Sequence, residues 1–163
     1  MSKLEWIQHK IYYRENMVRE CNVWRTIGKK IVFTNGCFDI LHHGHLDLLA
    51  RAASLGNILI VGINTDSSVQ RLKGPARPVT NEQDRMFQVA SLLCTDAVCL
   101  FDEDTPEALI KMIRPDVLVK GGDYTIDKIV GADFVKSNGG SVEIIPFVTG
   151  YSTTSLIQRI QGL

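Results

Sequence analysis

Two histidines three residues apart, His42 and His45, follow a short apolar segment and a glycine. Residues 29–33 predict a buried strand, Gly36 permits a tight turn, and the leucines and alanines after Leu41 predict a helix. Both histidines fall in the first turn of that helix, on one face. Unpaired backbone N–H groups and the positive end of the helix dipole favour an anion there. The spacing therefore predicts a phosphate site flanked by two imidazoles.

A zinc site or a solvated helix end would account for the histidine cluster less well. Histidine is a common zinc ligand, but a structural zinc site needs four ligands, and Cys37 is the one nearby candidate to join the histidines. An incidental cluster at a solvated helix end would leave the flanking strand and turn unexplained. We therefore predict no metal ligands among the site residues, and no phosphoryl or acyl chemistry here requires Cys37 as a nucleophile.

Length and composition are typical of one catalytic domain. The 163 residues suffice to bury about two thirds of the unfolded surface, without disulfides or a metal. We predict a single domain over residues 1–163, with an N-terminal helical extension (1–28) and a catalytic core (29–163). An apolar stripe in the extension, with two tryptophans, could cover a sheet edge or contact a second subunit: Leu4, Trp6, Ile7, Ile11, Val18 and Trp24.

Charge and hydropathy argue against several classes of partner. Eighteen basic and eighteen acidic residues cancel, so no broad basic field indicates binding to nucleic acid or membranes. The sequence has no apolar run of about 18 residues and no apolar core of a signal peptide near Met1, which favours a cytoplasmic protein. The four cysteines form no C-x-x-C pair, and free thiols are expected.

Strand and helix patterns alternate along the core. Apolar, β-rich runs predict five strands at residues 29–33, 57–63, 97–101, 116–120 and 141–146. Helices are predicted at 46–54, 66–72, 82–93, 106–113 and 129–137, with Thr105 and Pro106 as a cap and first-turn pair and Thr80 as a cap. This alternation predicts a Rossmann-like, doubly wound α/β fold: a parallel five-stranded sheet with helices on both faces and a ligand at the carboxyl ends of its central strands.

A basic segment follows the second predicted strand. Arg71, Lys73 and Arg77 stand among glycine and prolines, as in a mobile loop that closes over phosphates, although a solvated surface loop has the same composition. Further along, Arg85 could reach a phosphate or pair with Glu82 three residues earlier.

Two later segments also combine polar groups with glycine. Lys120 to Tyr124 ends the fourth predicted strand, where the residues could form a solvated strand terminus or contact a ligand. Ser152 to Ser155 places four hydroxyls before an apolar helical pattern, and a helix cap accounts for only part of that run.

Together these motifs resemble the cytidylyltransferase-like nucleotidyltransferases, whose signature H-x-G-H matches His42 to His45, with His43 at the variable position. The flanks and the strings R-L-K-G-x-x-R-P, K-G-G-D-Y and S-T-T look like the branch that makes ADP-heptose, and the likeness spans about residues 29–161. It implies catalytic roles for His42, His45 and Lys73. It further implies nucleotide contacts from Thr34, Asn35, Gly36, Cys37, Phe38, Gly44, Arg85, Gly121, Gly122, Gly150, Ser152, Thr153 and Thr154, and substrate contacts from Asp39, Arg71, Lys120 and Asp123.

The resemblance also implies a reaction: transfer of AMP from ATP to a heptose 1-phosphate, with Mg²⁺ on the phosphates and no covalent intermediate. Cytidylyltransferases of the glycerol 3-phosphate type tend to carry an arginine before the S-T-T motif, whereas residues 146–149 here have no positive group, which favours ATP. A CTP-dependent transferase, a non-catalytic nucleotide-binding regulator and a flavodoxin-like carrier are the alternatives; the last has no use for H-x-G-H. A separate sugar kinase and a homodimer are the expected partners.

Overall fold

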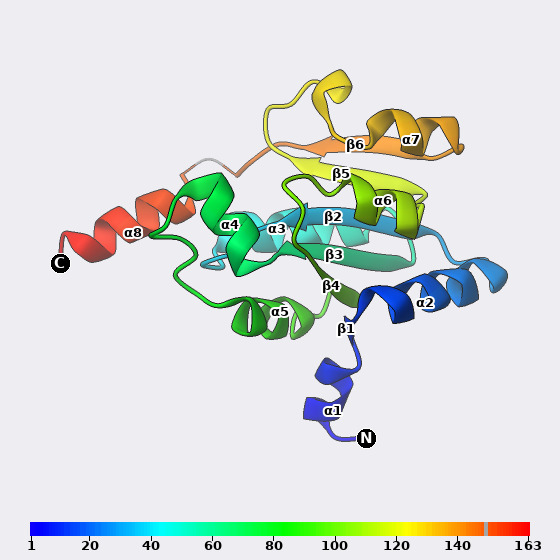
Figure 1. Ribbon diagram of the computed structural model, residues 1–163, viewed down its shortest axis with the longest axis horizontal. Coiled ribbons are helices and arrows are strands. Elements are labelled where there is room, and N and C mark those ends of the chain that lie inside the picture. The colour runs from blue at the N-terminus through cyan, green and yellow to red at the C-terminus, as the bar shows by residue number, and fades with distance from the viewer. Residues whose placement is uncertain (149) are drawn as a thin grey trace.

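The computed structural model describes residues 1–148 and 150–163, and its centre is one six-stranded parallel sheet. The strand order is β1-β4-β3-β2-β5-β6 (Figure 1). The strands are β1 (Ile11–Tyr12), β2 (Ile31–Gly36), β3 (Ile58–Asn64), β4 (Ala97–Phe101), β5 (Val117–Gly121) and β6 (Ser141–Ile145). The Rossmann-like α/β prediction is confirmed.

The predicted number of strands was too low by one. All five predicted strands are present, but the extension contributes β1, which pairs with β4 at Ile11–Val98 and Tyr12–Cys99. Two residues are too few for an alternating pattern, and Ile11 also fitted the apolar stripe of a helix. The extension is therefore two helices with an edge strand between them.

Helices cover both faces of the sheet (Figure 1). One face carries α2, α6 and α7, and the other carries α3 and α5, while α8 extends outward from the sheet. The helices are α1 (Lys3–Gln8), α2 (Arg14–Thr26), α3 (His43–Ala53), α4 (Asp66–Lys73), α5 (Glu82–Ala90), α6 (Glu107–Ile113), η1 (Ile126–Lys128), α7 (Ala132–Ser137) and α8 (Thr153–Gln161).

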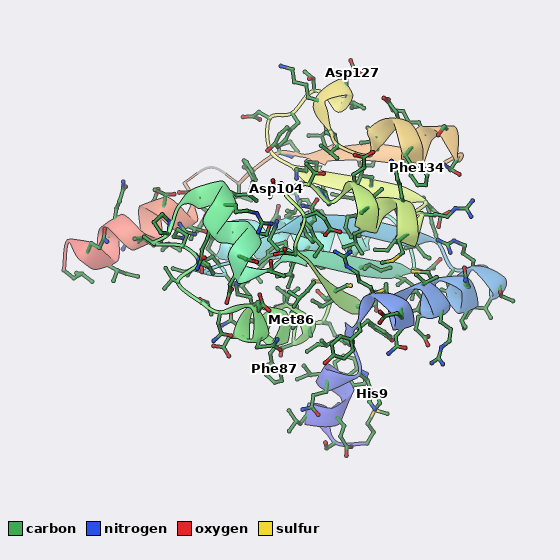
Figure 2. All side chains as sticks on the ribbon, viewed as in Figure 1. His9, Met86, Phe87, Asp104, Asp127 and Phe134 are labelled. Carbon is green, nitrogen blue, oxygen red and sulfur yellow. The ribbon has the colours of Figure 1, made fainter. Side chains whose placement is uncertain are left out.

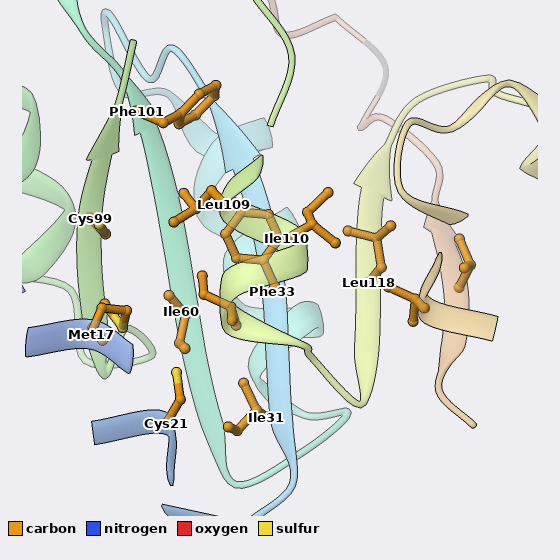
Figure 3. Packing of buried hydrophobic residues seen from close by; sticks show 14 of the residues in the cluster. Met17, Cys21, Ile31, Phe33, Ile60, Cys99, Phe101, Leu109, Ile110 and Leu118 are labelled. Atoms are coloured by element: carbon orange, nitrogen blue, oxygen red, sulfur yellow. The ribbon is translucent and has the colours of Figure 1, made fainter. Parts of the chain in front are cut away.

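Two apolar cores follow from this layering. Alternate residues of the central strands point to opposite faces, so Phe33 packs with α2 and α6 while Val32 packs with α3 and α5. Figure 3 shows the first core, in which Leu109 and Ile110 of α6 lie over Phe33 and Ile60. Burial on both faces explains why these strands are continuous apolar runs.

Some helix ends differ from the predictions. Asn81, not Thr80, caps α5, because its side chain accepts the Asp84 N–H. Pro106 precedes α6 with no side-chain cap, so the predicted cap by Thr105 is wrong. The helix predicted at residues 129–137 begins at Ala132, after Gly131 takes a φ of 86°.

The strand order reverses next to β2. From β2 the chain moves through β3 and β4 on one side, then crosses to β5 and β6 on the other. In open parallel sheets a ligand binds at such a switch point, outside the carboxyl ends of the strands. Among the described residues, no helix is long and apolar enough to span a membrane.

Candidate active site

The turn after β2 leads directly into the histidine helix. Phe38 takes a left-handed φ of 48°, and its ring lies so close to Gly36 that a Cβ there would approach it to 3.0 Å. A side chain at position 36 would therefore press on the Phe38 ring, at the point where the backbone turns toward α3. The ring of Phe38 also meets His45 edge-on, with 5.2 Å between centroids.

His42 and His45 form a stacked pair at the start of α3. Their ring centroids are 3.8 Å apart and their planes differ by 20°. His42 is the N-cap residue and its side chain makes no capping bond, so both rings remain available to a ligand. Gly44 lies between His42 and Tyr151, where a Cβ would sit 3.2 Å from the imidazole. This glycine therefore supports the histidine pair by close packing.

Burial keeps the histidine pair neutral in the free protein. It lowers the pKa of His45 to about 4, with smaller contributions from His42 and Lys73. Burial also lowers the pKa of His42. A neutral imidazole still offers one N–H to a phosphate oxygen. Lys73 and His45 line the same cleft, so the positive charge of Lys73 also disfavours protonation of His45.

The shifted pKa of His45 predicts acid sensitivity. As pH falls from 6.5 to about 4, His45 becomes protonated in the unfolded chain but stays neutral in the folded protein. The free energy of unfolding should therefore decrease over this range. The expected decrease is on the order of 2 kcal/mol. Urea unfolding of the wild type and of His45→Gln at about pH 7 and about pH 4.5 measures it, with the smaller pH dependence expected in the variant. Equal pH dependence in both proteins would contradict the assignment.

A cleft of about 550 Å³ opens at the carboxyl ends of β2, β3 and β5. It brings together many of the predicted site residues: Asn35, Gly36, Cys37, Phe38, Asp39, His45, Lys73, Lys120, Gly121 and Thr153. These residues come from four segments of the chain, and Lys73 and Thr153 are 80 positions apart. The predicted meeting of the histidine turn, the basic segment and the hydroxyl segment is therefore present.

Three lysines line the cleft. Lys73 ends α4, whereas Lys120 and Lys128 belong to β5 and η1. Burial lowers the pKa of Lys120. No salt bridge forms with Lys120 among the described residues, and its ammonium lies 5.7 Å from the Tyr124 ring centre. A partly desolvated cation without a carboxylate partner favours an anionic ligand.

The hydroxyl segment, residues 152–155, supplies one residue that caps α8 and another that lines the cleft. The Ser152 hydroxyl accepts the Ser155 N–H at 3.0 Å and caps α8, as expected of a serine at a helix start. Thr153 lines the cleft, whereas Gly150, Ser152 and Thr154 do not. Thr149, which belongs to the segment used to favour ATP over CTP, lies outside the described residues.

Arg85, for which a nucleotide contact is predicted, does not line the cleft and is held by protein groups beneath it. Its side chain is 0% exposed, and its guanidinium donates to three backbone carbonyls and to Asp66. The alternative ion pair with Glu82 is also wrong, because the Glu82 carboxylate accepts the Asp66 N–H. Arg85 therefore pairs with Asp66, 19 positions earlier, and not with Glu82, three positions earlier.

Asp39 lines the cleft but is 1% exposed and fully engaged by protein donors. It accepts from Arg77 Nε (2.6 Å) and from the N–H groups of Val79 and Thr80 (2.8 Å each). Burial alone would raise the pKa of Asp39, but these donors outweigh it and lower the pKa. In the free protein Asp39 is therefore engaged by protein groups, and its substrate contact stays a prediction.

Arg71 faces away from the cleft. It pairs with Asp104 at 2.8 Å and also contacts Asp102, in a neighbouring hollow of about 650 Å³. Asp104, which lies beside α4 in Figure 2, borders both hollows. In the free protein the acidic residues after β4 hold the Arg71 guanidinium, and the substrate contact of Arg71 stays a prediction. The loop after α4 is also held in place, because Arg77 donates to Asp39.

Five other predicted residues lie around the cleft rather than on its wall: Thr34, His42, Gly44, Gly122 and Asp123. Thr34 is buried within β2. Gly122 has a φ of 118°, which favours glycine whatever surrounds it, and a Cβ there would also approach the Phe147 ring to 2.7 Å. Asp123 is exposed outside the cleft.

Several lining residues were missed by sequence reasoning. They include Asp104, Thr105, Tyr124, Lys128 and Phe147. All of them follow β4, β5 or β6, and the rule that ligands bind at carboxyl ends of strands could have found them. Among the described residues, no group of three or more His, Cys, Asp or Glu side chains could hold a metal ion.

The sequence and fold match known proteins. A family profile described as cytidylyltransferase-like matches residues 33–159. The chain is 54% identical to bifunctional protein HldE of Syntrophotalea carbinolica over 151 residues, covering 93% of this chain and 31% of that protein. For HldE of Caulobacter vibrioides the identity is also 54%, over 153 residues, covering 94% and 32%. The chain thus spans about a third of the length of these curated relatives.

Solved structures agree with this assignment. The crystal structure of a lipopolysaccharide core biosynthesis protein from Thermoplasma volcanium has a TM-score of 0.60 and 28% identity, covering 77% of this chain and all of that one. A pantoate-beta-alanine ligase from Francisella tularensis shares the fold alone, with a TM-score of 0.60 and 15% identity, covering 94% of this chain and 78% of that one. With the histidine pair at a helix start beside the switch-point cleft, the family profile and the HldE relatives establish that the chain is a nucleotidyltransferase of the cytidylyltransferase-like family.

Proposed function

We propose that the chain transfers AMP from ATP to a heptose 1-phosphate and releases pyrophosphate. The observation that carries this proposal is the meeting of His45, Lys73 and Thr153 in one cleft. Its heptose acceptor is supported by the string Lys120 to Tyr124, by identity to the HldE proteins, and by similarity to a lipopolysaccharide core biosynthesis protein. ATP is favoured because no positive residue stands at positions 146–149.

The residues of the cleft suit this reaction without a protein nucleophile. The acceptor phosphate is already ionised at neutral pH, so an oxygen can attack the α-phosphorus in line while pyrophosphate leaves. His45, neutral at pH 7, donates an N–H to a phosphate oxygen, with His42 stacked behind it. Lys73 adds positive charge on the same side. Catalysis is then positioning and stabilisation of negative charge.

Mg²⁺ would enter this cleft bound to the phosphates of ATP. Asp39 is occupied by Arg77 and two backbone N–H groups, and Asp104 by Arg71, so neither carboxylate is free to build a metal cage. Mg²⁺ commonly binds substrate phosphates with few protein ligands, and there it would neutralise charge on the phosphate oxygens. Its binding therefore requires no dedicated protein site.

Pyrophosphate release tests the proposal. The chain is incubated with Mg²⁺, one nucleoside triphosphate and one acceptor, in a grid of ATP or CTP against heptose 1-phosphate or glycerol 3-phosphate. Release is expected with ATP and heptose 1-phosphate only. Release with CTP and glycerol 3-phosphate would overturn the proposal in favour of a cytidylyltransferase, and binding without release in any combination would indicate a regulator.

The wider setting is part of the same proposal. A sugar kinase reaction would supply the 1-phosphate, the site is contained in one domain, the active form is a homodimer, and the location is the cytoplasm. Light scattering coupled to size exclusion tests the dimer, for which a mass near twice 18.2 kDa is expected.

A further inference from the structure

Thr80 is held from both sides by residues of different segments. Its N–H donates to Asp39 Oδ1 at 2.8 Å, and its carbonyl accepts from Arg85 Nε at 2.9 Å. Asp39 belongs to the turn that leads into the histidine helix, whereas Arg85 lies in α5. The loop after Lys73 is therefore tied to the histidine turn at a fixed point.

Arg85 ties two further segments to the same point. Its Nη1 donates to the carbonyl of Cys37 at 2.5 Å, and its Nη2 donates to the carbonyl of Asn64 and to Asp66 Oδ1, both at 2.8 Å. Cys37 follows β2, Asn64 ends β3 and Asp66 begins α4. The planar guanidinium of Arg85 is fully buried and thus joins the ends of β2 and β3 to α4, the helix that carries Lys73.

Lys73 stands between these two attachments. Upstream, α4 is only eight residues long and is held at its first residue by Arg85. Downstream, Gly74 turns with a φ of 92° in open space, and Asp39 then fixes the chain from Arg77 to Thr80. Among the described residues no side-chain hydrogen bond or salt bridge holds the Lys73 ammonium, so its place in the cleft with His45 depends on the backbone on either side.

We propose that Asp39 and Arg85 are positioning residues, which join the histidine turn to the Lys73 segment and so set the distance between Lys73 and the histidine pair. Neither residue touches the reacting phosphate in this arrangement. The proposal deepens the proposed function, because its kinetic consequence rests on nucleotidyl transfer. Its structural consequence, the proximity of Lys73 and His45, is independent of which substrates are used.

A kinetic cycle tests this coupling. Asp39→Asn keeps the shape but replaces one acceptor oxygen by an NH₂ group, which cannot accept from Arg77 or the loop. If Asp39 acts by placing Lys73, Asp39→Asn should lower kcat about tenfold in the wild type, yet less than about twofold in a Lys73→Ala background. An equal loss in both backgrounds overturns the proposal.

The control is another carboxylate that accepts a backbone N–H, placed at the opposite end of β2. Asp116 Oδ2 accepts the Ile31 N–H at 2.7 Å, far along the strand from the cleft, and Asp116→Asn should leave kcat unchanged. Thermal unfolding confirms that each variant is folded at the assay temperature. Arg77→Lys is the second variant, because it retains the charge but lacks the Nε donor to Asp39, and it should show the same dependence on Lys73.

Histidine titration by NMR tests the proximity without any reaction. Lys73 contributes to the low pKa of His45, so Asp39→Asn should raise that pKa in the otherwise wild-type chain and leave it unmoved when Lys73 is alanine. A His45 pKa that Asp39→Asn does not move overturns the proposal. If no combination of triphosphate and acceptor released pyrophosphate, the proposed function would be wrong. The NMR titration would still test the positioning role, because it needs no reaction.

Discussion

Replacing His45 with alanine is expected to lower kcat for pyrophosphate release about 10²- to 10³-fold, which is the usual effect of removing one preorganised donor to a developing charge. His45 lines the cleft, is held against His42 and Phe38, and is neutral at pH 7. Its ring is therefore held in place by packing before any ligand binds. Steady-state kinetics with saturating ATP and heptose 1-phosphate measure the loss.

His43 provides the matched control within the same helix. It is exposed, it stands at the variable position of the motif, and it does not line the cleft. His43→Ala should change kcat less than about twofold, because exposed substitutions away from a site seldom matter. Near-normal turnover in His45→Ala, or an equal loss in His43→Ala, would contradict the assignment of the catalytic histidine.

Replacing Arg85 with alanine should lower the free energy of unfolding by about 3–5 kcal/mol, as expected when one partner of a buried charged network is removed. Three carbonyls and the Asp66 carboxylate would lose their donor, and a side-chain-sized cavity would open beneath the site. Arg85→Lys should be only partly better, since one ammonium cannot reach four acceptors in different directions. Urea unfolding measures both variants.

The control for Arg85 is an arginine on the surface. Arg51 is 62% exposed on α3 and pairs with Asp47 one turn earlier. Arg51→Ala should change the free energy of unfolding by less than about 0.5 kcal/mol, because exposed pairs contribute little. A loss below about 1 kcal/mol for Arg85→Ala would show that the network does not hold the strand ends and α4 together.

Three of the predicted ligand-binding residues share one feature in the structure. Arg85, Asp39 and Arg71 were expected to bind ligand, yet each found protein partners 19 to 48 positions away along the chain. A guanidinium or a carboxylate can take either a ligand or a protein group of opposite polarity as its partner. Which partner each group met depended on how α4, α5 and the loop between them pack on the strand ends.

The sequence by itself determined the alternation of strands and helices, the site at the start of α3 and the family. Apolar runs, turn residues and the H-x-G-H spacing are local features of the sequence, so they can be recognised before the fold is known. The tertiary structure alone decided that β1 joins the sheet edge, that Lys73 and Thr153 meet in one cleft, and that Asp39 and Arg85 bind the protein. Those outcomes depend on contacts between distant segments, which only the packed chain brings within hydrogen-bonding distance.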